Sequence, residues 1–346
     1  MAACRKALTL CRLSSRIESA RFFHRWQRPT FQQLYKLRKM AGPEAEKPRS
    51  AQTNWNRDGE LYAFGERLGE LLGARTLDRA FTHESYVARE EEERRRLGIA
   101  REEEEGGKLD VDHNGALIER GTAIVSTYTK AYLRHQLPNL PEEGICAIHD
   151  YLTSDNMLEY IGSNLGMKDL ILSEDFPVRT HTVGQTFRAV VGALANDQGE
   201  ERAQLFVQDF VLTQLVNQDV SEMWTLVNPM GVLTMILQQR GMVLPEPRIL
   251  RSTGSSTVVA CYVVGIYSNK QLIGQAPGET EITAEEMAAR DALAGIFGIR
   301  NAAATLKLGT AGRHLTIDPA ARNPSLDSLC GRPLGGDSAT VSMAAT

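Results

Sequence analysis

Two short runs of acidic, histidine and cysteine residues could hold a metal ion in this sequence. The run Asp110-Val-Asp112-His-Asn114-Gly115 has the spacing of oxygen ligands that begins a calcium-binding EF-hand loop. The twelfth position of such a loop needs a bidentate Glu, and this sequence has Gly121 there. Because the coordination shell would be incomplete, the run argues against a calcium site.

The second run contains Cys146, His149 and Asp150. His149-Asp150 suggests a metal-dependent phosphohydrolase, but no second His and Asp cluster supports that interpretation. The sequence therefore favours a helical His that is bonded to its neighbour. Cys146 and His149 alone supply too few ligands for zinc. The sequence also lacks a nucleophile elbow, a P-loop and a dinucleotide fingerprint. It therefore predicts no metal and no cofactor.

Composition narrows the class of protein further. A chain of 346 residues predicts two or three domains, and 42% apolar with 24% charged residues is typical of globular proteins. No apolar run is long enough to span a bilayer. Five Cys without a CxxC pair argue against a disulfide scaffold and a structural zinc site.

Charge is distributed unevenly along the chain. Residues 1–40 hold ten Lys and Arg against one acid, whereas the rest of the chain has a net charge of −13. An Arg-rich, acid-poor N-terminus is typical of a mitochondrial transit peptide, which predicts the mitochondrial matrix as the location. The alternative is a basic arm that binds RNA or acidic lipid. Residues 41–55 are polar and contain Pro, and they predict a linker.

Apolar spacing predicts a helical domain over residues 56–217. Helices are expected from Arg57 onwards, along 117–132, after a capping Ser154, and over 183–196 and 203–215. The charge runs at 90–96 and 102–105 are typical of a solvated helix with i,i+4 ion pairs. No strand is expected before residue 245.

A different pattern follows a second linker at 218–227. A helix over 228–240, closed by Gly241, precedes β-rich runs at 248–251, 258–267 and 271–275 and a helix at 283–297. The order α-β-β-β-α predicts a small α+β domain over 228–299. Residues 300–346 lack periodicity and predict a disordered tail. The fold class is therefore multidomain, with an all-α domain followed by a small α+β domain.

Three segments of the helical region resemble the ribonuclease III family. The segment 77–86 is similar to the first conserved helix of these enzymes, the segment 114–125 to their signature helix, and the segment 185–193 to a later helix. Their order matches that of the family. The resemblance implies a ribonuclease III-like helical domain, and it implies a dimer of the type that these enzymes form through the signature helix.

The catalytic positions of that family are changed in this sequence. The resemblance implies five carboxylates that hold Mg²⁺ for phosphodiester hydrolysis, at positions that here are Gly115, Ile118, Thr122, Gln185 and Arg188. None is an acid. Glu119 cannot replace the acid missing at Ile118, because one helical step turns it by about 100°. The sequence therefore predicts an emptied metal site with no catalytic residue.

The α-β-β-β-α region resembles a double-stranded-RNA-binding domain. The resemblance implies two Lys before Ala284 that grip phosphate, and here Glu281 and Ile282 occupy those positions; Met235 stands where the first helix usually offers a Glu. The remaining candidate RNA-binding residues of the domain are Arg240, Arg248, Arg251, Lys270 and Arg290. Duplex binding is therefore expected to be weak.

The two domains together resemble a family of large-subunit proteins of the mitochondrial ribosome. That resemblance implies a structural component that contacts rRNA and neighbouring ribosomal proteins. Two alternatives stay open. One is an active mitochondrial endoribonuclease III acting on double-stranded RNA, and the other is an RNA-binding factor that visits the ribosome transiently during assembly.

Overall fold

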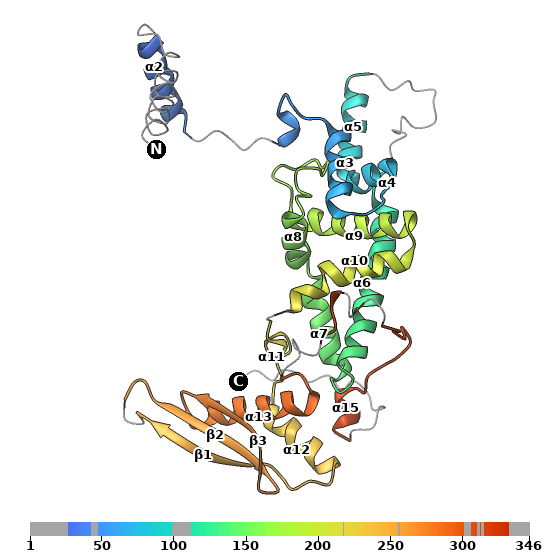
Figure 1. The fold of residues 1–346 in the computed structure, drawn as a ribbon. Coiled ribbons are helices and arrows are strands. Elements are labelled where there is room, and N and C mark those ends of the chain that lie inside the picture. Colours follow the sequence, from blue (N-terminus) through green and yellow to red (C-terminus); the bar gives the residue numbers. More distant parts are fainter. Residues whose placement is uncertain are drawn as a thin grey trace, which may run out of the picture. The chain divides into compact units, whose positions relative to one another are not determined.

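The computed structural model describes residues 27–42, 48–98, 112–216, 218–254, 257–300, 306–309, 312 and 315–331 (Figure 1). The chain divides into two compact units, Met1–Ala51 and Gln52–Thr346. Most of the predicted transit peptide, the acidic run at 102–105 and the end of the tail lie outside the described residues. Among the described helices, none combines the length and the apolar composition that a membrane span requires.

The first unit contains the helix α2 (Gln27–Ala41) and the 3-10 turn η1 (Arg49–Ala51). α2 has no acid in its first turn and carries Arg38 and Lys39 in its last turn. Its large apolar side chains are exposed: Phe31, Leu34, Tyr35, Leu37 and Met40. α2 is thus a basic helix with exposed apolar side chains, within the segment predicted as a transit peptide.

The second unit begins with a helical domain, as the apolar spacing predicted. Its helices are α3 (Arg57–Leu68), α4 (Ala74–Phe81), α5 (Glu84–Arg96), α6 (Gly115–Gln136), α7 (Glu142–Thr153), α8 (Asp155–Asn164), α9 (Thr180–Asp197), α10 (Glu200–Phe210) and α11 (Val220–Met223). Ser154 caps α8 as predicted, since its Oγ accepts the N–H of Met157 at 3.3 Å. The helix predicted over 203–215 is divided into α10 and the 3-10 turn η2 (Leu212–Leu215).

The helices α6 and α9 cross at two glycines. A Cβ atom on Gly121 would clash with the backbone oxygen of Arg188, and one on Gly192 would clash with the backbone oxygen of Leu117. Only glycine allows the two backbones to approach this closely. Gly121 is therefore buried against α9 of the same chain.

The small domain has the predicted α-β-β-β-α order. It consists of α12 (Pro229–Gln239), β1 (Glu246–Thr253), β2 (Cys261–Ser268), β3 (Gln271–Gly278) and α13 (Glu281–Phe297), and its antiparallel sheet has the order β1-β2-β3. A stripe of alanines on α13 is buried: Ala284, Ala288, Ala289 and Ala292. In the described residues the first strand begins at Glu246, as expected; only the isolated bridge between Thr82 and Leu172 precedes it.

The sequence placed several strand boundaries wrongly. The second strand was expected from residue 258, but Val258 and Val259 are exposed in the β1–β2 connection, and pairing begins at Cys261. The preference of valine for strands is overridden there by a turn, because Gly254 has φ 63° and its carbonyl accepts the N–H of Thr257. β1 is longer than predicted because β2 pairs with it from Glu246 to Thr253.

The predicted disorder of 300–346 is wrong for part of the tail. Asn323 Nδ2 donates to the carbonyl oxygens of Leu137 and Leu140, at 2.9 and 2.8 Å, and a short helix, α15 (Leu326–Leu329), follows. Scattered apolar residues of the tail pack against the core: Leu306, Leu308, Leu315, Ile317, Leu326 and Leu329. They occur as short, widely separated pairs, which are too few in a row to predict an element, so the sequence pattern did not reveal them.

Candidate functional site

The five positions that the ribonuclease III resemblance assigns to a metal site lie on the two helices that cross at Gly121. Gly115, Ile118 and Thr122 are on α6, and Gln185 and Arg188 are on α9. The crossing brings the backbone of Arg188 against α6, next to Thr122. No hydrogen bond connects any two of these five side chains, so the structure places them on adjoining helices without linking them to one another.

The α6 positions offer no carboxylate to a divalent ion. Gly115 donates its N–H to Nδ1 of His113 at 3.1 Å, and a Cβ atom at Gly115 would meet that imidazole ring. Ile118 is partly buried against the core, and Thr122 is exposed. Hard divalent ions need several oxygen ligands, preferably carboxylates. This half of the site is therefore apolar or neutral.

Gln185 is held by a histidine from the start of α5. Its Oε1 lies 3.0 Å from Nε2 of His83. His83 Nδ1 accepts the backbone N–H of Ser85, which leaves the ring proton on Nε2 to donate to Gln185. The amide of Gln185 thus serves as a neutral hydrogen-bond partner that ties α9 to the α4–α5 corner.

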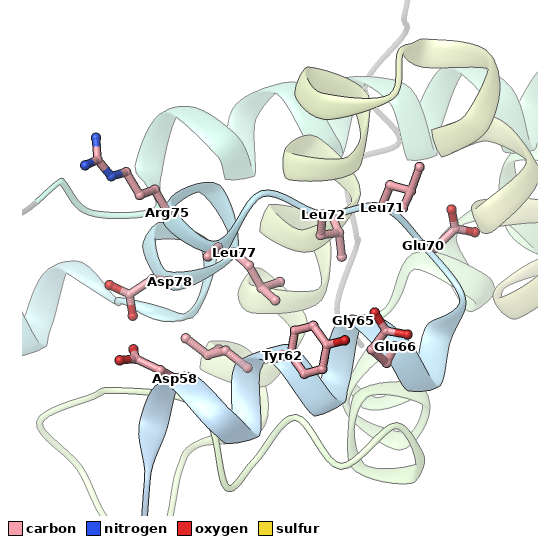
Figure 2. A pocket seen from close by; sticks show the side chains of 12 residues that line it. Asp58, Tyr62, Gly65, Glu66, Glu70, Leu71, Leu72, Arg75, Leu77 and Asp78 are labelled. Carbon is pink, nitrogen blue, oxygen red and sulfur yellow. The ribbon is translucent and has the colours of Figure 1, made fainter.

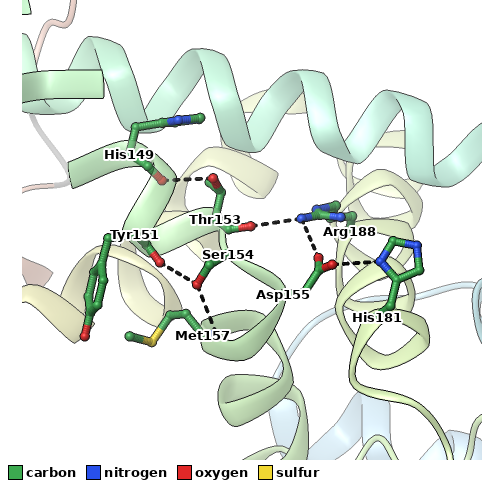
Figure 3. A network of polar contacts seen from close by, with 8 residues as sticks. All are labelled: His149, Tyr151, Thr153, Ser154, Asp155, Met157, His181 and Arg188. Carbon is green, nitrogen blue, oxygen red and sulfur yellow. Dashed lines mark hydrogen bonds and ion pairs between the residues drawn. The ribbon is translucent and has the colours of Figure 1, made fainter. Parts of the chain in front are cut away.

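Arg188 belongs to a network of polar contacts that includes residues of α7, α8 and α9 (Figure 3). Its Nη2 donates to the carbonyl oxygen of Thr153 at 2.9 Å and to Oδ1 of Asp155 at 3.1 Å. Asp155 Oδ2 lies 2.7 Å from Nδ1 of His181. The Arg188 side chain is only 17% exposed. Its positive charge is therefore largely shielded from water and is balanced by one carboxylate.

The position of this guanidinium stabilises two helix ends at once. Thr153 ends α7, where backbone carbonyls lack helical partners, and Asp155 lies in the first turn of α8, where a negative charge is favoured. Burial alone would raise the pKa of Asp155, but the hydrogen bond from His181 and the charge of Arg188 hold that pKa below its ordinary value. The carboxylate therefore stays ionised and paired at neutral pH.

Asp155 and His181 did not stand out in the sequence. Asp155 follows the capping Ser154, so its position in a helix N-terminus was readable, but its partner Arg188 lies 33 residues further along the chain. Among the residues that the structure describes, no group of three or more His, Cys, Asp or Glu is arranged to hold a metal ion.

Several residues of the two motifs set aside in the sequence have protein partners, although Asp110 lies outside the described residues. Asp112 pairs with Arg79 at 3.3 Å, and Asn114 donates to the carbonyl oxygen of Ala80 at 3.2 Å. His149 Nδ1 lies 2.9 Å from Asp150, as expected for a locally bonded histidine. Burial lowers the pKa of His149, and the hydrogen bond to Asp150 opposes that effect only in part.

The candidate RNA-binding residues of the small domain lie on different elements. Arg240 ends α12, Arg248 and Arg251 lie on β1, Lys270 is in the β2–β3 turn, and Arg290 is on α13. Arg248 is paired with Glu246 at 2.7 Å and covers the ring of Tyr267. The five candidates therefore come from four separate places in the small domain.

The start of α13 carries no positive charge. Glu281 is exposed there, and Ile282 is 73% exposed. The strand β3, with eight residues, separates this end of the sheet from Lys270. At a rise of about 3.4 Å per residue, that separation is roughly 25 Å. Lys270 therefore cannot replace the missing pair.

Fold and site together define a ribonuclease III-like helical protein with an appended double-stranded-RNA-binding fold. Residues 56–194 match the family model described as large ribosomal subunit protein mL44, endonuclease domain, and residues 224–330 match the MRPL44 dsRNA-binding domain. The second match includes residues 315–330 of the tail.

Individual relatives agree with these matches. The chain is 35% identical over 277 residues to the large ribosomal subunit protein mL44 of Caenorhabditis elegans, which covers 80% of this chain and 68% of the relative. It is 25% identical over 238 residues to ribonuclease 3 of Enterococcus faecalis, covering 67% and 95%. The nuclease domain of ribonuclease III from Campylobacter jejuni aligns with a TM-score of 0.35 at 16% identity, covering 48% and 99%. The chain belongs to the mL44 family.

Proposed function

We propose that this chain is a structural component of the large subunit of the mitochondrial ribosome, where it contacts rRNA and neighbouring proteins without cleaving RNA. Membership of the mL44 family and the basic residues 1–40 support this proposal. The observation that carries the loss of catalysis is the Arg188 guanidinium, which is paired with Asp155 where the resemblance implies an acid.

Metal-dependent hydrolysis needs a cation that polarises the phosphate and activates water. Arg188 repels a divalent ion by its charge, and Gln185 Oε1 is engaged by His83. The α6 positions add no carboxylate. With all five ligands changed, the fold keeps its helix crossing and loses the means to hold Mg²⁺.

Contact with rRNA is proposed to be spread over many weak interactions. The candidate cations of the small domain lie on separate elements, and the start of α13 is acidic and apolar. Duplex affinity comes chiefly from clustered Lys and Arg that release counterions. Protein surfaces then supply much of the binding energy. A second copy of the chain would have to meet a face of α6 other than the Gly121 face, which α9 covers.

Sedimentation tests the proposed role. The tagged full chain in isolated mitochondria should sediment with the large subunit. It should stay there after a high-salt wash, because salt weakens the charged contacts with RNA but not the apolar contacts with neighbouring proteins. A transient assembly factor would be released by the wash, and a free ribonuclease would sediment at the top of the gradient in low salt as well. Either result would contradict the proposal.

Import is tested separately. Residues 1–40 fused to a reporter should direct it to mitochondria, because the segment holds ten basic residues and one acid. The control replaces Arg12, Arg16, Arg21 and Arg25 by Gln and should stay outside. Cytosolic retention of the unchanged fusion would show that this segment is not a transit peptide.

A further inference from the structure

A pocket of about 310 Å³ lies between α3 and α4 (Figure 2). Leu61 and Leu77 form its floor and belong to the buried core. Two large apolar side chains of its lining remain in solvent: Tyr62 is 70% exposed and Leu71 is 84% exposed. Apolar surface that gathers around a concave site is typical of a binding site, because its burial releases about 25 cal/mol per Å².

The loop that presents Leu71 is fixed on both sides. Glu70 receives hydrogen bonds from Nε and Nη2 of Arg202, at 2.8 and 2.6 Å. Two residues beyond Leu71, the N–H of Gly73 donates to Oδ2 of Asp197 at 2.7 Å. Leu71 is therefore held in solvent between two anchors, and a side chain that is fixed before binding loses little conformational entropy when it is covered.

Charged groups surround the apolar floor. Four carboxylates and one guanidinium line the pocket: Asp58, Glu66, Glu70, Asp78 and Arg75. Arg202 neutralises Glu70, and Arg57 pairs with Asp78 at 2.7 Å. Within the described part of the chain, Asp58 and Glu66 have no basic partner. The Glu66 carboxylate accepts the Tyr62 hydroxyl, which raises the pKa of Tyr62.

Asp58, Tyr62 and Glu66 follow one another along one face of α3 at four-residue spacing (Figure 2). The two carboxylates flank the aromatic ring, and a rise of about 1.5 Å per residue separates them by roughly 12 Å. The exposed side of the pocket therefore presents negative charge, an apolar ring and negative charge in a row.

The order of these groups selects the class of ligand. The carboxylates are not arranged to hold a metal ion, as judged over the described residues. RNA is disfavoured, since phosphates are repelled by unpaired carboxylates. A peptide segment with an apolar side chain between two cations complements the row in both hydrophobicity and charge.

We propose that the α3–α4 pocket docks a segment of a neighbouring protein, in which a large apolar side chain is flanked by Lys or Arg residues about 12 Å apart. The apolar side chain packs on Leu71 and Tyr62, and the cations pair with Asp58 and Glu66. The inference rests on the proposed ribosomal function, because it identifies a protein-facing surface of the chain within that particle.

Photocrosslinking inside the assembled particle tests the inference. Arg75 is exposed at the pocket and is replaced by p-benzoylphenylalanine, which leaves both carboxylates and Leu71 in place. The full chain is expressed in cells, and large subunits are isolated and illuminated. We expect one protein adduct, mapped by mass spectrometry to a peptide with an apolar residue between two basic ones. The same photoreactive residue at exposed Tyr160 of α8 serves as the position control.

Charge reversal tests the role of the carboxylates. In the photoreactive chain, Asp58→Lys with Glu66→Lys should lower the adduct yield about tenfold, because two attractive pairs become repulsive. The matched control, Glu92→Lys with Glu119→Lys, reverses two exposed carboxylates outside the pocket and should leave the yield unchanged. Equal melting temperatures of both doubly substituted chains exclude unfolding as the cause.

The possible failures are distinguishable. A chain that is absent from the large subunit before illumination contradicts the proposed function and this inference together. A chain that sediments with the large subunit but gives an RNA adduct, no adduct, or a protein adduct insensitive to Asp58→Lys and Glu66→Lys contradicts the docking site alone.

Discussion

The Arg188 network and the start of α13 have both changed charge relative to the families that they resemble, but in opposite surroundings. Arg188 is largely buried, and Asp155 together with the Thr153 carbonyl satisfies its guanidinium. Glu281 and Ile282 are exposed, and the structure shows no partner for either among the residues it describes. A charge introduced into an interior must be compensated by its neighbours, whereas water compensates one on a surface. The positions that the resemblance assigns to a metal site thus include a buried, paired cation, while those that it assigns to phosphate binding lie on an open surface.

The largest effect on stability is expected at the crossing of α6 and α9, where the two backbones are closest. Gly121→Leu in the full chain should abolish folding or lower the melting temperature strongly, because overpacking costs about 1–3 kcal/mol or more and the α9 backbone cannot move aside easily. Thermal unfolding measures this effect. Ala123→Leu, two residues away on the exposed side of α6, is the control and should change stability little. Equal melting temperatures for both variants would show that the crossing is loose.

Removing the buried guanidinium should have the next largest effect. Arg188→Met leaves the Thr153 carbonyl and Asp155 without this donor and should cost about 1–2 kcal/mol, near the lower end for charged hydrogen bonds because Asp155 is 39% exposed. Urea unfolding of the full chain measures the loss. Arg251→Met removes an exposed cation on β1 and should stay within about 0.5 kcal/mol of the unchanged chain. If both substitutions cost the same, the network does not stabilise the domain.

Substitutions at the start of α13 should change the affinity for RNA and leave the stability of the fold unchanged. Glu281→Lys with Ile282→Lys should raise the affinity of the full chain for a generic RNA duplex and steepen its salt dependence, by at most about 2 in slope for two added phosphate contacts. The unfolding free energy should hardly change, since both side chains are exposed. Titrations at several salt concentrations measure the slope. Tight, steeply salt-dependent binding by the unchanged chain would show that other residues already form a duplex-binding surface.

A change of pH should have a smaller effect on the free energy of unfolding. The pKa of Asp155 is lowered in the folded chain, so its contribution to stability is present above the ordinary carboxyl pKa, near 4, and is lost as the pH falls through the lowered value. The difference in unfolding free energy between the unchanged chain and Arg188→Met should therefore narrow between about pH 5 and pH 3. A difference that stays constant over this interval would show that the ion pair does not stabilise the fold.

Much of this comparison was readable in the sequence. The helical spacing predicted α6 and α9, and the resemblance implied the five changed positions and the replaced Lys pair. The partners of Arg188 were not readable, because Thr153 and Asp155 are brought to it by the packing of α7 and α8 next to α9. The exposed Val258 and Val259 show the same limit, since turn geometry overrode the preference of valine for strands. Local patterns predict elements, whereas long-range partners depend on how those elements pack.

The last prediction is that the chain has no ribonuclease activity, so no change in catalysis is expected. The full chain should not cleave duplex RNA with Mg²⁺ or Mn²⁺, because none of Gly115, Ile118, Thr122, Gln185 and Arg188 is an acid. Gln185→Asp with Arg188→Glu restores both acids of α9 and still should not create activity, since α6 contributes no ligand and a divalent ion needs several. That variant should also lose stability, because the introduced carboxylate on α9 would repel Asp155 instead of pairing with it. Gel assays with labelled duplex, with and without EDTA, measure cleavage. Metal-dependent cleavage by the unchanged chain that disappears on substituting Gln185 or Arg188 would show that the site is still catalytic and that the interior network is not only scaffold.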